Sequence, residues 1–166
     1  MTPTEQYVDI LTRLKPGDLG LLRVNARHRL DESVDGFDLF TGLWWPLRER
    51  NEAAPRRDVA WLIAKLYAYC PIPHSPHDFL ARQLRRCQPI EKQASERYCK
   101  RFDRMLLLPL SQIEPALQWA LDRVASNSLR LDWVRLTNDL SIWERESVRL
   151  KWAEQYLQTN ERKEPC

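Results

Sequence analysis

The sequence predicts an all-α protein made of two packed helical parts. Apolar residues recur at spacings of three and four along most of the chain, which is the period of an amphipathic helix. Four glycines are too few for a glycine-rich phosphate loop or a turn-rich β architecture. An apolar fraction of 43% with seven tryptophans argues against disorder. The 166 residues are enough for a chain to bury roughly two thirds of its unfolded surface.

The N-terminal helical part is expected to span residues 1–70. Thr2 and Glu5 have the spacing of a capping box, so a first helix should start there and end at Pro16 and Gly17. A second helix is predicted over 19–29, where Arg23 and Arg27 are four residues apart and form a basic edge.

Two further helices complete this part. The aromatic segment 37–45 reads as a helix that Pro46 stops, followed by a charged connector. Residues 59–70 are apolar on most of the circumference, which is typical of a central bundle helix.

The segment "PIPHSPH", 71–77, has three prolines and is interpreted as a connector between the two parts. The C-terminal helical bundle is predicted over 78–158. Within it, Ser111 and Glu114 have the spacing of a second capping box before an apolar stripe that ends at Val124. A last helix is expected over 147–157, and residues 159–166 are predicted to form a frayed tail.

The segment 131–143 carries the clearest core residues. Its large apolar side chains lie three and four apart, so they fall on one stripe of a helix and are predicted to pack in the core. These residues are Trp133, Leu136, Leu140 and Trp143.

Net charge is only +3, so attraction to a polyanion must come from the local arrangement of charges. Segment 82–104 holds eight basic and three acidic side chains. Four of the basic ones recur at helical spacing and form a stripe: Arg97, Lys100, Arg101 and Arg104. The arginine fork suits phosphate oxygens, and this pattern alone fits either a nucleic acid or the acidic surface of a protein partner.

Neither a metal site nor a catalytic site is predicted. Cys70, His74, His77 and Cys87 lack the ligand spacing of structural zinc sites, and no other cofactor motif is present. The carboxylates between Asp132 and Glu146 have no His or Cys nucleophile near them in sequence, so surface ion pairs are the simpler explanation.

The first residues and the hydropathy of the chain bear on its location. Segment 1–10 lacks the basic and apolar regions of a secretory signal. No apolar run approaches the roughly 20 residues that cross a bilayer. We therefore expect a cytoplasmic protein without a membrane partner.

The order of five segments resembles the CasB family, the small subunit of the type I-E CRISPR effector complex called Cascade. The segments are "KPGDLGLLRV", "FDLFTGLWW", "VAWLIAKLYAYC", "ERYCKRFDRMLL" and "LRLDWVRLTNDLSIW…VRLKWAEQYL". Together they cover nearly the whole chain. The most specific are the basic segment ending in Arg101–Leu106 and the Leu-Asp-Trp…Asp-Leu-x-x-Trp pattern.

The resemblance implies a non-enzymatic, all-helical subunit present in two copies. It further implies basic surface residues that hold the target and displaced DNA strands of the R-loop, and contacts with the backbone subunits, the large subunit and the guide RNA within the complex. Arg23, Arg56, Lys100 and Arg101 match the family's basic positions. Leu22 stands where relatives often have a second basic residue, so two alternatives stay open: Arg27 substitutes for it, or the contact at this site is weaker. The alternative remains a helical adaptor that binds acidic proteins and has no affinity for nucleic acid.

Overall fold

The computed structural model describes residues 1–25 and 34–158. The predicted contact residue Arg27 and the predicted frayed tail 159–166 lie outside these residues. Helices make up all the regular structure of the described chain, apart from one isolated bridge between His74 and Leu131, so the predicted all-α class is confirmed.

The chain forms two compact units. Among the described residues, the first comprises 1–25, 34–71 and 133–141, and the second comprises 72–132 and 142–158. The sequence-based division assigned all of 78–158 to one C-terminal bundle. In the structure, 133–141 instead packs in the first unit, because its apolar stripe faces helices from the start of the chain.

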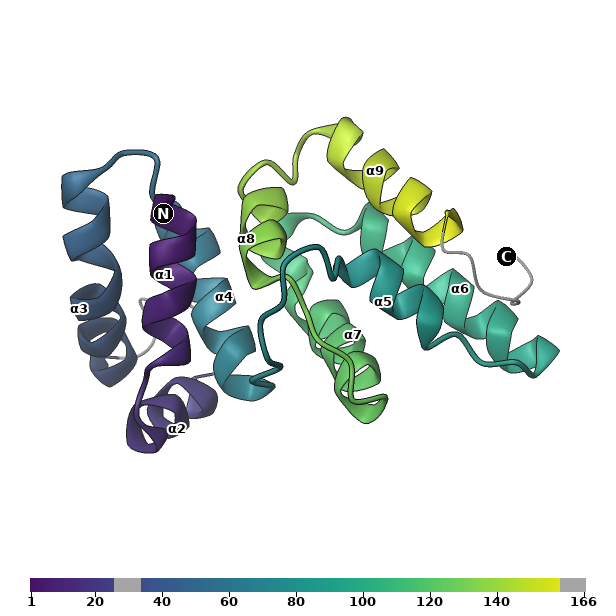
Figure 1. The fold of residues 1–166 in the computed structure, drawn as a ribbon, viewed down its shortest axis with the longest axis horizontal. Coiled ribbons are helices and arrows are strands. Elements are labelled where there is room, and N and C mark those ends of the chain that lie inside the picture. Colours follow the sequence, from purple (N-terminus) through teal and green to yellow (C-terminus); the bar gives the residue numbers. More distant parts are fainter. Residues whose placement is uncertain (26–33, 159–166) are drawn as a thin grey trace. The chain divides into compact units, whose positions relative to one another are not determined.

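The first unit contains five helices among its described residues, and α4 is their centre (Figure 1). From Val59 to Ala68 every residue of α4 except Tyr67 is buried, as its all-round apolar sequence predicts, and the helix contacts α2, α3 and α8. The helices are α1 (Pro3–Thr12), α2 (Pro16–Val24), α3 (Val34–Arg50), α4 (Arg57–Tyr69) and α8 (Trp133–Ser141).

The start of α1 has the capping box that the sequence predicts. The Glu5 amide donates to Thr2 Oγ1 at 3.2 Å, and the Thr2 amide donates to Glu5 Oε2 at 2.5 Å. The α1 helix is then tied to α4 by Tyr7, whose hydroxyl donates to the Ala60 carbonyl at 2.6 Å. Burial raises the pKa of Tyr7, so this hydroxyl remains a hydrogen-bond donor in alkaline solution as well as at neutral pH.

Helix α2 begins earlier than predicted. It starts at Pro16, which occupies the first helical position, whereas the sequence had Pro16 and Gly17 as the end of α1. Proline fits there because the first turn of a helix has no acceptor for its amide in any case. The described part of α2 ends at Val24.

Helix α3 corrects the prediction that Pro46 is a stop, because the helix continues to Arg50. Proline removes one helical hydrogen bond, and contacts on both sides of it offset that loss. The Trp44 indole N–H donates to the Pro55 carbonyl at 2.6 Å, and Arg48 Nη1 donates to the Ala54 carbonyl at 2.9 Å. The connector after α3 thus folds back onto the helix and holds its last turns.

The bounds of α8 correct the prediction that one helical stripe runs through 131–143. The helix ends at Ser141, so Trp143 lies in the following turn and belongs to the second unit, although it is as fully buried as the other three residues. Trp133 packs edge-on against Tyr67 of α4, with ring centroids 5.3 Å apart. Thr4 Oγ1 of α1 donates to Asn138 Oδ1 at 3.0 Å, which closes the first unit.

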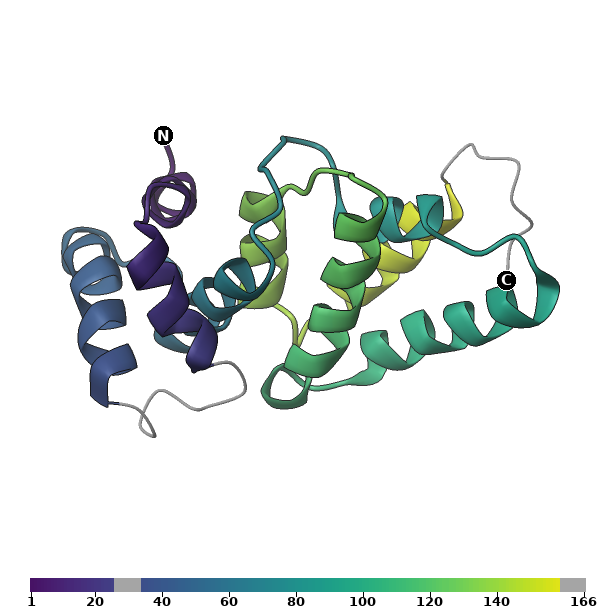
Figure 2. The same ribbon diagram turned by 90° about the horizontal axis from the view of Figure 1, so that it is seen from below.

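The second unit is built from four α-helices and a short 3-10 turn among its described residues. Helix α5 runs beside both α7 and α9 (Figure 1), and α6 is the long teal helix at the lower right of Figure 2. The elements are α5 (Leu80–Arg86), α6 (Lys92–Leu107), η2 (Leu110–Gln112), α7 (Glu114–Ser126) and α9 (Glu146–Leu157).

The predicted capping box at Ser111 and Glu114 is wrong. Ser111 lies inside η2, and Ile113 occupies the N-cap position of α7 without a side-chain hydrogen bond. Pro109 starts the 3-10 turn, since its carbonyl accepts from the Gln112 amide at 3.0 Å. Ser111 is therefore part of the 3-10 turn, two residues before the N-cap position, and its side chain does not cap α7.

Aromatic side chains hold the second unit together. Phe102 of α6 stacks on Tyr156 of α9 with ring centroids 4.4 Å apart. Trp143 meets Trp152 of α9 edge-on at 5.0 Å, and its indole N–H donates to the Leu108 carbonyl at 2.8 Å. Such ring pairs contribute about 0.5–1.5 kcal/mol beyond the area they bury.

Removing either buried tryptophan should destabilise the protein strongly. We expect Trp133→Ala or Trp143→Ala to cost about 3–5 kcal/mol, because each leaves a large cavity. Chemical denaturation followed by circular dichroism measures this cost. Trp45→Ala is the control: its side chain is 50% exposed, so a change within about 0.5 kcal/mol is expected. Equal losses of stability at all three positions would contradict the conclusion that Trp133 and Trp143 are core residues and Trp45 is not.

The N-cap of α6 predicts an acid-dependent contribution to stability. Glu91 accepts hydrogen bonds from the Ala94 and Gln93 amides, at 2.7 and 3.0 Å, and these bonds lower the pKa of its carboxyl. Because the folded-state pKa lies below the unfolded one, the contribution is present above the unfolded pKa and is lost as pH falls through the folded pKa.

Glu91→Ala should therefore lower the melting temperature at pH 7 and make little difference at pH 3. Thermal melts of the variant and the parent at both pH values measure this. Glu154→Ala removes an exposed carboxylate on α9 and serves as the control. A Glu91→Ala deficit that is the same at pH 3 and pH 7 would show that ionisation of the cap is irrelevant.

Candidate nucleic-acid interface

Helix α6 has one buried face and one basic face. Tyr98, Cys99, Phe102 and Met105 are buried along one side of the helix. At 100° per residue, the four predicted contact residues fall within about 100° of arc on the other side. Arg97, Lys100, Arg101 and Arg104 are all exposed, and we call them the α6 basic stripe.

The acidic residues of α6 border the α6 basic stripe on one side, next to Lys100. At 100° per residue, Glu96 and Asp103 lie about 140° or more from Arg101 and about 80–100° from Arg104, but both are neighbours of Lys100. Within the described residues, no carboxylate forms an ion pair with any member of the stripe. Arg97 interacts electrostatically with Glu91 at the start of the helix, and no ion pair with a described carboxylate competes directly with an external anion for the other members of the stripe.

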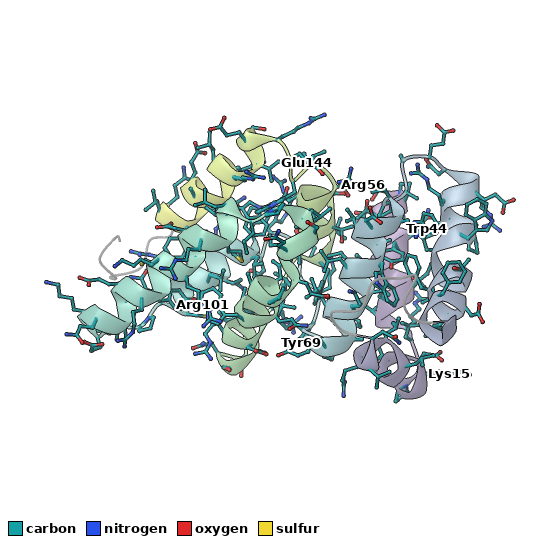
Figure 3. All side chains as sticks on the ribbon, turned by 180° about the vertical axis from the view of Figure 1, so that it is seen from behind. Lys15, Trp44, Arg56, Tyr69, Arg101 and Glu144 are labelled. Atoms are coloured by element: carbon teal, nitrogen blue, oxygen red, sulfur yellow. The ribbon has the colours of Figure 1, made fainter. Side chains whose placement is uncertain are left out.

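One stripe residue rests on an aromatic ring. The guanidinium carbon of Arg101, which is labelled in Figure 3, lies 4.8 Å from the centroid of the Trp119 ring on α7. Trp119 in turn packs against Tyr98, with ring centroids 5.2 Å apart. The Tyr98 hydroxyl donates to the Leu84 carbonyl at 2.6 Å, and burial raises the pKa of Tyr98, which keeps the donor protonated.

Two other predicted contact residues lie in the first unit. Arg23, near the end of α2, is exposed and donates from Nε to the Ala68 carbonyl at 3.0 Å. Arg56 is exposed at the N-cap position of α4 (Figure 3). Ala68 and Arg56 are twelve residues apart on one helix, or about 18 Å at 1.5 Å per residue. Arg23 and Arg56 are thus at opposite ends of α4 and do not form one cluster.

The basic run 82–104 does not form a single surface. Arg85 is only 3% exposed, and its guanidinium lies over the Tyr156 ring, 5.5 Å from the centroid. Arg85 Nη1 also donates to Gln88 Oε1, so this arginine is a structural group inside the second unit. Only the part of the run on α6 presents a continuous basic face.

The residues considered for a metal site carry no arrangement for one. In the described segments, no group of three or more His, Cys, Asp or Glu side chains is placed to hold an ion. Cys70 and Cys87 are half-buried. The described helices also include none that is long and apolar enough to cross a membrane.

Sequence reasoning missed Trp119 as part of the basic surface. It is not among the contact residues predicted from the sequence. No spacing rule connects it to Arg101, since the two residues lie on different helices and meet only after α6 and α7 have packed.

Comparison with known proteins agrees with this fold. Residues 19–157 match the family model described as CRISPR-associated protein Cse2. Comparison with curated protein sequences gives no match.

Solved structures match over nearly their whole length. CasB from M. ruber superposes with a TM-score of 0.75 at 22% identity, covering 95% of this chain and 94% of that one. CasB from Thermus thermophilus gives 0.67 at 25% identity, with 95% and 99% covered. A CRISPR-associated protein of the Cse2 family, also from Thermus thermophilus, gives 0.67 at 26% identity, with 95% and 99% covered.

The family match spans most of the chain, and the fold is shared with solved CasB and Cse2 structures. The chain therefore belongs to the CRISPR-associated protein Cse2 family, a membership that implies a subunit of the CRISPR effector complex Cascade.

Proposed function

We propose that this protein is the non-catalytic small subunit of a type I-E Cascade in the cytoplasm, where it serves antiviral defence by binding the opened DNA. In this proposal it holds the target and displaced strands without regard to sequence and thereby stabilises the R-loop. It also bridges the backbone and large subunits around the guide RNA, together with a second copy of itself.

The observation that carries the proposal is the α6 basic stripe. Four exposed cations lie along about 10 Å of one helix, a length that matches about three phosphates at 3.4 Å per nucleotide. Arginine presents a planar fork of donors that suits phosphate oxygens. Phosphates carry no base identity, so binding through this surface is independent of sequence.

Arg23 supports the same function. Its Nε is committed to the Ala68 carbonyl, which orients the guanidinium, while its Nη groups form no hydrogen bond with any residue that the structure describes. An arginine fixed in this way keeps two donor groups for a phosphate and loses less freedom when it binds.

The energetic role proposed for the protein follows from the small difference in free energy between the closed DNA duplex and the R-loop. The RNA–DNA heteroduplex is about as stable as the DNA duplex that it replaces, so a small protein contribution decides whether the strands stay separated. Cations that bind the separated strands supply such a contribution. No chemical step is needed, and the proposal includes no catalytic residue and no cofactor.

Binding of single-stranded DNA should weaken with salt in proportion to the number of phosphate contacts. The expected log–log slope is about −0.7 per contact. The variant Lys100→Gln/Arg101→Gln/Arg104→Gln should therefore reduce the magnitude of the slope by about 2, with an unchanged melting temperature because the three side chains are exposed. Anisotropy titrations at several salt concentrations measure the slope.

The matched control neutralises three other exposed cations of the same unit: Lys92, Arg145 and Lys151. It removes the same net charge and should change the slope less. If both variants have the parent's slope, or if the parent does not bind DNA and binds an acidic protein instead, the chain is a protein adaptor and the proposal fails.

In an assembled complex, the same triple variant should reduce R-loop formation more than guide-RNA loading. The reason is that the stripe is proposed to bind the opened DNA and not the guide. Guide content of the purified complex measures loading, and permanganate reactivity of the displaced strand measures the R-loop. A variant complex that opens DNA as well as the control would exclude this role for α6.

A further inference from the structure

Arg101 differs from the other members of the α6 basic stripe in having a ring beneath it. Its guanidinium carbon lies 4.8 Å from the Trp119 centroid. Arg97, Lys100 and Arg104 make no ring contact with a described residue. Arg101 is thus the one stripe cation, among those described, whose position is set by a neighbouring helix.

The ring beneath Arg101 is itself held in place. Trp119 is 9% exposed and packs on Tyr98, which is fixed by the hydrogen bond of its hydroxyl to the Leu84 carbonyl. The contacts therefore run from α5 through Tyr98 of α6 to Trp119 of α7, and from there back to Arg101 on α6. Three helices take part in placing one guanidinium.

Stacking on a ring leaves the useful part of the guanidinium free. The Trp119 ring lies beneath the guanidinium carbon, and the N–H donors of a guanidinium lie in its own plane, so they need not face the ring. A phosphate can then accept two parallel hydrogen bonds at that edge. Because the ring is nearly buried and covered by Arg101, it is not available as a stacking platform for a base.

We propose that Trp119 is a positioning residue for nucleic-acid binding: its contact with Arg101 presets the guanidinium to bind a backbone phosphate. This inference rests on the proposed function and deepens it by naming a residue that touches no DNA. An arginine without such support must give up rotamer freedom when it binds. Loss of the ring should therefore weaken binding through Arg101 alone.

The test is a double-mutant cycle on the full chain with a single-stranded oligonucleotide as the probe. Trp119→Leu should weaken binding about two- to fivefold, the range that corresponds to an exposed cation–π contact. This loss should disappear when Arg101→Gln is already present. Trp119→Phe, which keeps a ring, should restore most of the affinity.

Arg104→Gln is the matched control, because Arg104 lies on the same face of α6 without a ring. The Trp119→Leu loss should persist in full in the Arg104→Gln background. A purely structural role for Trp119 predicts the same loss in both backgrounds, and that result would overturn the inference. If Trp119→Leu does not fold, Trp119→Phe is used in the same two backgrounds with a smaller expected loss.

The cycle also separates failure of this inference from failure of the proposed function. If Arg101→Gln and Arg104→Gln bind like the parent, the stripe does not bind DNA and both conclusions fall. If both substitutions weaken binding while the Trp119 effect is unchanged by Arg101→Gln, the stripe binds DNA but Trp119 does not position Arg101.

Discussion

The second unit depends on the aromatic contacts of one helix face. Tyr98 connects α6 to the Leu84 carbonyl of α5 and to the Trp119 ring of α7, while Phe102 stacks on Tyr156 of α9. These contacts prevent α6 from rotating about its axis, because a rotation that exposed Phe102 would break the contacts of Tyr98 and those of Phe102 at the same time. The orientation of the basic face is therefore a consequence of apolar packing on the opposite side. Charge alone would not fix it, since exposed like charges repel and contribute little to folding.

The first unit uses a different arrangement. Helix α4 is buried on nearly all sides by α2, α3 and α8, so its two ends are the places where it meets solvent. Arg56 lies at one end, and Arg23 binds the Ala68 carbonyl near the other. A carbonyl in the last turn of a helix lacks a partner within the helix, and an arginine donor there also agrees with the direction of the helix dipole. The hydrogen bond from Arg23 thus gives the Ala68 carbonyl of α4 a donor and also orients the Arg23 side chain.

The sequence predicts local features well where one physical requirement dominates. The burial of α4 and the capping box at Thr2 and Glu5 are confirmed. A helix that is apolar on all sides must be buried to leave water, and the first amides of a helix need an acceptor outside the helix, so each pattern allows few other structures. The pattern at Ser111 and Glu114 has the same spacing, but Pro109 starts a 3-10 turn that removes Ser111 from the cap position. Pro46 does not end α3, since contacts from the following connector hold the helix beyond it. For the candidate interface, spacing identifies the exposed stripe on α6. It cannot distinguish the buried Arg85 from its exposed neighbours, or pair Arg101 with Trp119, because both depend on how helices pack.

The position of α8 has a consequence for synthesis of the chain. The first unit is completed by residues 133–141, and Thr4 is joined to Asn138 across 134 positions of sequence. A nascent chain emerging from the ribosome therefore exposes the apolar surfaces of α1 and α4 until α8 follows, after α5, α6 and α7 of the second unit have been made. Closing so long a loop is also slow compared with local helix packing. The unit that begins first is thus completed late, and a fragment ending at residue 71 would lack the helix that covers it.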